Sequence, residues 1–244
     1  MDHPDRAKDP AVTAATILVI GHVARLPLER LEVAAWSHGL VLEVVCPALG
    51  ERLPAIAGDY AGVVVLGGPQ SACDVARHPY LPEEITFISA AHHARIPVLG
   101  ICLGSQLLAA ALGGQARPGD SGLECGFIEV VPNGEEGAEV AGRHFSFHSD
   151  TFQLPARATL LASTDRYPQA WRLADSLAIQ FHPELDKAGV ESLLDIETGK
   201  LTRSGIDVES LHTEAAEELR AQQDGVRLID QWMERRAPRP DQPR

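Results

Sequence analysis

The sequence has few cysteines and no long hydrophobic run. Its 244 residues include four cysteines, none of them in a CxxC pair: Cys46, Cys73, Cys102 and Cys125. Isolated cysteines of this kind are typical of free thiols in a reducing compartment, and they disfavour a disulfide framework. No apolar stretch reaches the roughly 18 residues that a transmembrane helix needs. These absences indicate a globular chain, and its length is sufficient to bury a substantial core.

Basic residues are also scarce, with 21 Lys and Arg against 34 Asp and Glu and a formal net charge of −13. A surface of this sign repels phosphates, so we expect neither nucleic acid nor an anionic membrane as a partner. The segment 1–15 is charged and lacks the continuous apolar core of a signal peptide. We therefore expect a disordered leader over 1–15 and a cytoplasmic protein.

Nucleotide-binding and metal-binding patterns are missing as well. No P-loop is present, and "VIGHVARL" (19–26) lacks the glycines of a dinucleotide fingerprint. His92 and His93 fall in a predicted helix without a second pair at ligand spacing, which favours a solvated helix face over a metal site. The expectation is a protein with neither a metal nor a cofactor.

Apolar runs alternate with amphipathic segments through the first half of the chain. Strands are predicted over 16–22, 40–47, 62–69 and 97–101, and helices over 26–39, 81–96 and 103–112. Alternation of this kind predicts βαβ units, and therefore an α/β fold in which a mostly parallel sheet carries helices on both faces.

The second half has a different pattern. Short strands, antiparallel or mixed, are predicted over 127–132, 144–148, 159–164, 170–174 and 177–183. We expect one domain over 16–186, a helical extension packed on it over 187–236, and a loose tail over 237–244. Trp36 and Trp171 are expected in the core.

Cys102 lies where a predicted strand changes into a predicted helix. Open parallel sheets bind ligands at the carboxyl ends of their strands, and a helix N-terminus favours a thiolate. Gly100 and Gly104 flank the cysteine at two positions on either side, the spacing of a nucleophile elbow. The alternative is a cysteine that only packs behind the strand, so a catalytic role needs partners.

Candidate partners follow two other predicted strands. His182 ends an apolar run, and Glu184 stands close enough to orient its imidazole, as a base for a cysteine nucleophile requires. An oxyanion needs fixed donors, which the N–H of Leu103 and the glycine turn at 67–68 can supply. Taken singly, the His-x-Glu pair and the glycine turn are each common features without a special role.

Together, "VVLGGPQS" (64–71), "PVLGICLGSQLLAAALGG" (97–114) and "LAIQFHPE" (177–184) resemble the class I, triad-type glutamine amidotransferases. The closest likeness is to stand-alone members that are similar to the amidotransferase domain of GMP synthase. The resemblance implies a flavodoxin-like three-layer sandwich. It covers about 17–184 and continues weakly into the helical end. Nothing after Glu184 resembles the nucleotide loop of a synthase domain.

The resemblance also implies a role for each matching residue. Cys102 would form a γ-glutamyl thioester with L-glutamine and release ammonia, with His182 as general base and acid and Glu184 as its orienter. Gly68 and Leu103 would supply the oxyanion N–H groups. Gln106, Ser149 and Asp150 match positions that hold the substrate, although Ser149 replaces a glycine that is frequent in the family.

Several functions remain open at this point. The chain is expected to act on a small molecule, either L-glutamine, with the ammonia passed to a separate synthase subunit, or another γ-glutamyl compound in the manner of a γ-glutamyl peptidase. A non-catalytic regulatory protein on the same scaffold is the third alternative. The intact set of Cys102, His182 and Glu184 speaks against it. Related proteins of the chaperone and deglycase kind generally carry a histidine directly after the cysteine, where this chain has Leu103.

Overall fold

The computed structural model of the chain describes residues 14–55 and 60–238. The expected leader over 1–15 and the expected tail over 237–244 lie for the most part outside these residues. Ala15, which fell within the expected leader, already belongs to the first strand.

The described residues form a nine-stranded sheet in the order β2-β1-β3-β4-β11-β10-β9-β6-β7. Five neighbouring strands run parallel: β2 (Leu40–Val45), β1 (Ala15–Ile20), β3 (Tyr60–Val65), β4 (Val98–Ile101) and β11 (Ser176–Ile179). Antiparallel pairing then extends the sheet through β10 (Pro168–Leu173), β9 (Thr159–Ser163), β6 (Glu124–Pro132) and β7 (Gly142–His148). Two strands missed in the sequence, β5 (Gln115–Pro118) and β8 (Asp150–Gln153), pair separately.

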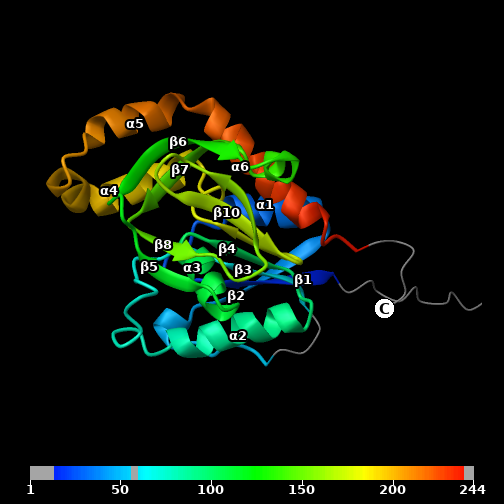
Figure 1. The fold of residues 1–244 in the computed structure, drawn as a ribbon. Helices are drawn as coiled ribbons and strands as arrows, with labels where there is room; N and C mark the ends of the chain where they lie inside the picture. Colours follow the sequence, from blue (N-terminus) through cyan, green and yellow to red (C-terminus); the bar gives the residue numbers. More distant parts are fainter. Residues whose placement is uncertain (1–13, 56–59, 239–244) are drawn as a thin grey trace, which may run out of the picture.

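Helices cover both faces of the parallel strands (Figure 1). Apolar side chains of α1 (Glu29–Ser37) and α6 (Leu219–Glu234) share one core cluster with the sheet, and those of α2 (Leu81–His93) and α3 (Leu103–Ala111) share another. Strands buried on both faces must be apolar at consecutive positions, which explains runs such as "ILVI" and "VVV". The predicted α/β sandwich is confirmed.

The C-terminal helices form a third cluster with the antiparallel end of the sheet. Residues of α4 (Lys187–Arg203) and α5 (Val208–Glu217) pack with Phe127 and Phe145, from β6 and β7. Asp186 caps α4 by accepting a hydrogen bond from the Gly189 N–H, 2.8 Å away. The 3₁₀ turns η1 (Pro47–Leu49) and η2 (Glu135–Glu139) complete the described elements. None of the helices in the described part of the chain has the length and apolarity to cross a membrane.

The two tryptophans expected in the core have opposite environments. Trp171 is fully buried, whereas Trp36 is 82% exposed and that expectation was wrong. Trp36 lies three positions after the exposed Val33 on α1, so these two apolar residues share the outer face of the helix. Helical spacing predicted the helix but could not say which of its faces meets the sheet.

A buried histidine on β7 makes the stability of the fold depend on pH. His144 is 1% exposed and stacks on Phe181 with ring centroids 4.0 Å apart. Burial lowers the pKa of His144 from 6.5 to about 4. Between pH 4 and pH 6.5 the unfolded chain protonates His144 and the folded chain does not. The contribution of neutral His144 to stability is therefore complete above pH 6.5 and falls as the pH drops towards 4.

We expect His144→Phe to remove this dependence. Between pH 7 and pH 4.5 the wild-type chain should lose about 2–3 kcal/mol more unfolding free energy than the variant, because only the wild type must protonate this ring. Urea unfolding at the two pH values measures the difference. Equal losses in both chains would show that His144 does not carry the effect.

Candidate active site

Three loops that follow neighbouring parallel strands meet at one edge of the sheet. Val65 of β3 pairs with Gly100 of β4, and Ile101 of β4 pairs with Ile179 of β11. The Cys102 N–H continues this ladder by donating to the Ile179 carbonyl over 2.8 Å. Three segments therefore leave the sheet side by side: the glycine turn, the cysteine and the His-Pro-Glu segment. This placement is expected, because open parallel sheets form their sites at the carboxyl ends of the strands.

Cys102 occupies a strained position between β4 and α3. Its φ is +52° and its ψ is −109°, a left-handed conformation that a side chain adopts at a cost. The turn is tight enough to exclude side chains on both flanks. A Cβ on Gly100 would lie 2.7 Å from the Gly104 carbonyl carbon, and one on Gly104 would lie 2.7 Å from that of Val65. The two glycines of the predicted elbow are therefore required by backbone contact.

His182 and Glu184 form a buried pair beside this cysteine. The Nδ1 of His182 lies 2.8 Å from the Glu184 Oε1, and the side chains are 9% and 2% exposed. The His182 N–H donates to the Phe145 carbonyl over 2.8 Å, which fixes the backbone. Burial alone would lower the pKa of His182, but Glu184 and Cys102 outweigh it and raise this pKa well above 6.5. Glu184 and Cys102 therefore favour the doubly protonated form of His182.

Gly67 lies close to both the cysteine and the histidine. A Cβ at this position would be 3.0 Å from His182 Cε1 and 3.4 Å from Cys102 Cβ. The Cys102 Sγ lies 3.8 Å from the Phe147 carbonyl oxygen. Gly67 thus lies against both residues, and a side chain there would crowd the His182 ring.

A cavity of about 580 Å³ opens over these residues. Cys102, His182, Glu184 and Gly68 line it, together with Phe147. Leu103 is the first residue of α3, where a backbone N–H has no partner within the helix. These placements agree with the oxyanion roles expected for Gly68 and Leu103, which remain predictions.

The three residues expected to hold the substrate lie together but are absent from the described lining of this cavity. The Gln106 side chain is buried and donates to the Asp150 carbonyl over 3.1 Å. The Asp150 carboxylate accepts from Ser71 over 2.6 Å, and the Ser149 carbonyl accepts from Gly119 over 2.9 Å. Their direct contact with substrate stays a prediction, while these bonds support the segment that follows Phe147.

Two other segments line the cavity and were missed in the sequence. One is the loop between β1 and α1, and the other is the start of α4 with the residues just before it. These residues include Arg25, Leu26, Pro27, Leu185, Ala188, Leu193 and Ile196. The pattern of α4 predicted a helix, but nothing in its local sequence signals that Leu193 and Ile196 line a cavity shared with a cysteine some 90 positions earlier.

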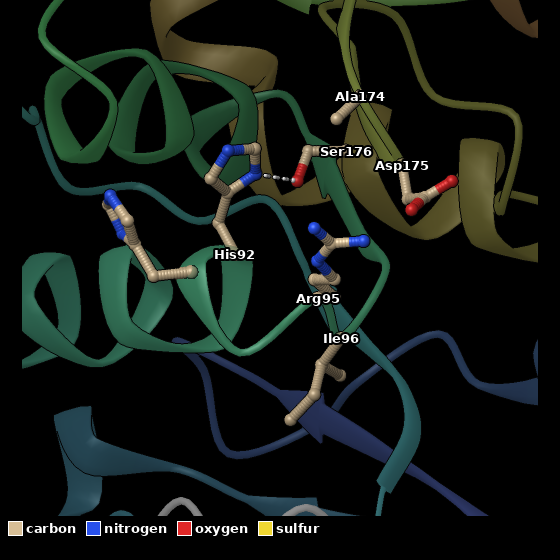
Figure 2. Close-up of a pocket in the computed structure, with 7 residues that line it drawn as sticks. His92, Arg95, Ile96, Ala174, Asp175 and Ser176 are labelled. Carbon is tan, nitrogen blue, oxygen red and sulfur yellow. Dashed lines mark hydrogen bonds between the residues drawn. The ribbon is translucent and has the colours of Figure 1, made fainter.

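A second cavity, of about 400 Å³, lies at the opposite end of β11. Figure 2 shows His92 pointing to Ser176, with Nδ1 and Oγ 2.8 Å apart, and Arg95 and Asp175 beside them. His92 is thus part of a side-chain hydrogen bond rather than a fully solvated face. Among the described residues, no group of three or more His, Cys, Asp or Glu could hold a metal ion.

Arg30 connects the His-Pro-Glu segment (182–184) to the C-terminal helix α6. Its guanidinium donates to the Pro183 carbonyl, between His182 and Glu184, and to the Gln222 Oε1 of α6 over 2.5 Å. Gly225 of α6 leaves room for this contact. A Cβ there would lie 2.7 Å from the Pro183 oxygen and 3.3 Å from the Arg30 Cζ.

We expect Gly225→Ala to lower kcat by roughly 10- to 100-fold, because it displaces the peptide that joins the histidine to its carboxylate. The matched control is Gly199→Ala on α4, where the nearest atom to an added Cβ is the end of Arg203, 3.4 Å away. The control should keep its activity. Steady-state kinetics with the melting temperatures of both variants test this, and equal kcat values would contradict it.

Comparison with known proteins agrees with this geometry. The family model of glutamine amidotransferase class-I matches residues 42–190. The GMP synthase [glutamine-hydrolyzing] of Serratia proteamaculans is 32% identical over 141 residues, which are 51% of this chain and 25% of that protein. The carbamoyl phosphate synthase small chain of Maricaulis maris is 36% identical over 128 residues, 50% of this chain and 31% of that protein. The chain thus spans about a quarter to a third of these relatives.

A glutamine amidotransferase from Thermotoga maritima superimposes with a TM-score of 0.81 and 28% identity, covering 92% of this chain and 99% of that one. The family model covers well over half of the chain and includes all three loops of the site. Cys102, His182 and Glu184 lie at the strand ends that the fold brings together. The chain belongs to the class I glutamine amidotransferase family of cysteine-dependent amide hydrolases.

Proposed function

We propose that this chain hydrolyses the γ-amide of L-glutamine through a thioester on Cys102. The observation that carries the proposal is the cysteine at +52° on its elbow, within a cavity that it shares with the buried His182–Glu184 pair. A strained nucleophile beside an oriented base is the arrangement that acyl transfer needs.

The proposed hydrolysis has two steps, formation of the thioester and its hydrolysis. The Cys102 thiol passes its proton to His182 and attacks the amide carbon as a thiolate, and the resulting oxyanion is stabilised by the N–H groups of Gly68 and Leu103. The second proton of His182 passes to the leaving nitrogen, and ammonia departs as the thioester forms. His182 then removes a proton from water, whose oxygen attacks the thioester, and His182 returns this proton to the departing sulfur as glutamate is released. Glu184 keeps the imidazole oriented throughout.

The ammonia released from glutamine could serve as the nitrogen donor of a synthase. The relatives include proteins named GMP synthase [glutamine-hydrolyzing] and carbamoyl phosphate synthase small chain. We propose a separate synthase partner for this chain. Turnover that rises when the partner is added would support this, and full turnover by the chain alone would contradict it.

A second candidate is a γ-glutamyl hydrolase that acts on larger substrates. The cavity of about 580 Å³ falls in the range of pockets for drug-sized ligands, and it extends to Leu193 and Ile196 on α4. An apolar amine bonded to the γ-carboxyl group would find room and apolar contact there. Higher kcat/KM for γ-glutamyl aryl amides or dipeptides than for glutamine would favour this candidate.

The deciding experiment combines turnover with the position of a covalent label. Ammonia and glutamate release from glutamine is measured beside γ-glutamyl dipeptides, and the chain is then treated with an electrophilic glutamine analogue. We expect mass spectrometry to find the adduct on Cys102, with Cys46, Cys73 and Cys125 as internal controls. No turnover on any substrate and no selective label on Cys102 would favour a regulatory protein without catalysis.

A further inference from the structure

A buried histidine outside the triad contacts the glycine turn of the site. His22 follows β1 and is 2% exposed, in the segment "VIGHVARL" that fails as a dinucleotide fingerprint. Its Nδ1 lies 3.2 Å from the Gly67 carbonyl oxygen, and its Nε2 lies 2.9 Å from the Glu84 Oε1 on α2. Both side chains of this His–Glu pair are fully buried. The mechanism above uses neither.

Hydrogen-bond accounting determines the direction of these contacts. A backbone carbonyl oxygen only accepts, so the contact to Gly67 is a hydrogen bond only when the His22 Nδ1 carries a proton. The Nε2 then either donates to an ionised Glu84 or accepts from a protonated one. Both arrangements leave Nδ1–H as the donor to Gly67, and both hold two exchangeable protons in the pair.

Fixing the Gly67 carbonyl also fixes the next N–H. The described peptide bonds are trans, so the Gly68 N–H points away from the carbonyl that His22 holds. Gly68 lies directly against His22, because a Cβ on it would be 2.6 Å from the His22 Cβ. The Gln70 side chain donates to the His22 carbonyl over 2.9 Å and closes the turn. Gly67 and Gly68 both line the cavity that contains Cys102.

Stability alone does not account for this pair. Well-packed apolar residues are often as stabilising as a buried ionic or polar pair, because burial costs the polar groups their hydration. Apolar residues at these positions would fill the same space between β1 and α2. They could not donate a hydrogen bond to Gly67, and that donation is what links the pair to the site.

We propose that His22, supported by Glu84, is a positioning residue that anchors the Gly67 carbonyl and so aims the Gly68 N–H at the oxyanion that forms on Cys102. The proposal rests on the function proposed above. His22 touches no reacting atom. It acts through the peptide of the turn and should therefore affect the transition state more than the binding of substrate.

Two amide substitutions at position 22 separate anchoring from packing. An asparagine places its amide nitrogen near the former Nδ1 and can still donate to Gly67. A glutamine places its amide near the former Nε2 and contacts Glu84 instead. We expect His22→Gln to lower kcat roughly 10- to 100-fold with little change in KM, because an interaction made only in the transition state is lost. His22→Asn should retain most of the wild-type kcat.

Both variants disturb the same buried pair, so an effect of packing alone would lower kcat equally. Equal losses, or a change confined to KM, would overturn the proposal. Glu84→Gln provides a further check, since its amide can donate to Nε2 and leave the Nδ1 proton in place. The His22 Nδ1 should stay protonated in this variant, and melting temperatures establish that each variant is folded.

Nuclear magnetic resonance tests the anchor without turnover. In the wild-type chain labelled with ¹⁵N-histidine, we expect a protonated Nδ1 of His22 at neutral pH with a scalar or through-space connection to Gly67. An unprotonated Nδ1 would overturn the anchor whatever the kinetics. A wild-type chain without turnover or label would instead refute the proposed function, and the resonance of His22 would still decide the hydrogen bond.

Discussion

Cys102→Ala is expected to lower kcat for amide hydrolysis by about 10⁶-fold, the cost of removing the nucleophile of a triad. The thioester cannot form without the sulfur, and the cavity then retains only its binding and oxyanion groups. Steady-state assay of ammonia release measures the loss. The fold should persist because alanine removes only one sulfur atom, from a buried side chain that borders the cavity.

Cys46→Ala is the matched control for this change. Cys46 is also buried, with its Sγ 3.7 Å from the Val23 carbonyl, but it is absent from the described lining of the cavity. The control should keep wild-type kcat while losing about 1 kcal/mol of stability. Comparable kcat losses in the two variants would show that loss of a buried thiol, rather than of a nucleophile, explains the result.

Glu184→Gln is expected to lower kcat by about 10³- to 10⁴-fold, as replacing the carboxylate of a triad does elsewhere. Glu184 raises the pKa of His182 and accepts from its Nδ1 over 2.8 Å. The neutral amide stabilises the imidazolium less and can hold the wrong tautomer. The pKa of His182 should therefore fall in the variant. Histidine resonances followed through a pH titration measure this shift beside kcat.

The protein carries its own control for this substitution in another buried His–Glu pair, His148 and Glu124. Glu124 Oε2 lies 3.0 Å from the His148 Nε2, and side-chain hydrogen bonds from Thr164 and Gln169 complete the cluster. Neither Glu124 nor His148 is among the described residues that line the cavity. Glu124→Gln should cost stability and leave kcat within a few-fold. A kcat loss as large as that of Glu184→Gln would contradict a specific role for Glu184.

Some parts of this site follow from the sequence alone. The elbow at Cys102 needs Gly100 and Gly104 because backbone atoms approach within van der Waals distance at both positions. Glycine two residues before and two residues after the cysteine is therefore a signal that the sequence shows. His182 and Glu184 are two residues apart, so their pairing is local. The carboxyl ends of parallel strands lie at the same end of the sheet, so the sequence also predicted that the cysteine and histidine motifs lie close together.

Other parts depend on partners that lie far apart in the chain. His22 and Glu84 are separated by 62 residues, and Arg30 and Pro183 by 153. The wall of the cavity formed by α4, and the exposure of Trp36, depend on which helix face packs inward. The residue type of an apolar or hydrogen-bonding side chain does not specify which distant residue it contacts. Local spacing therefore determined the proposed nucleophile and its proposed base, while only tertiary packing decided which residues hold them in place and how large the cavity is.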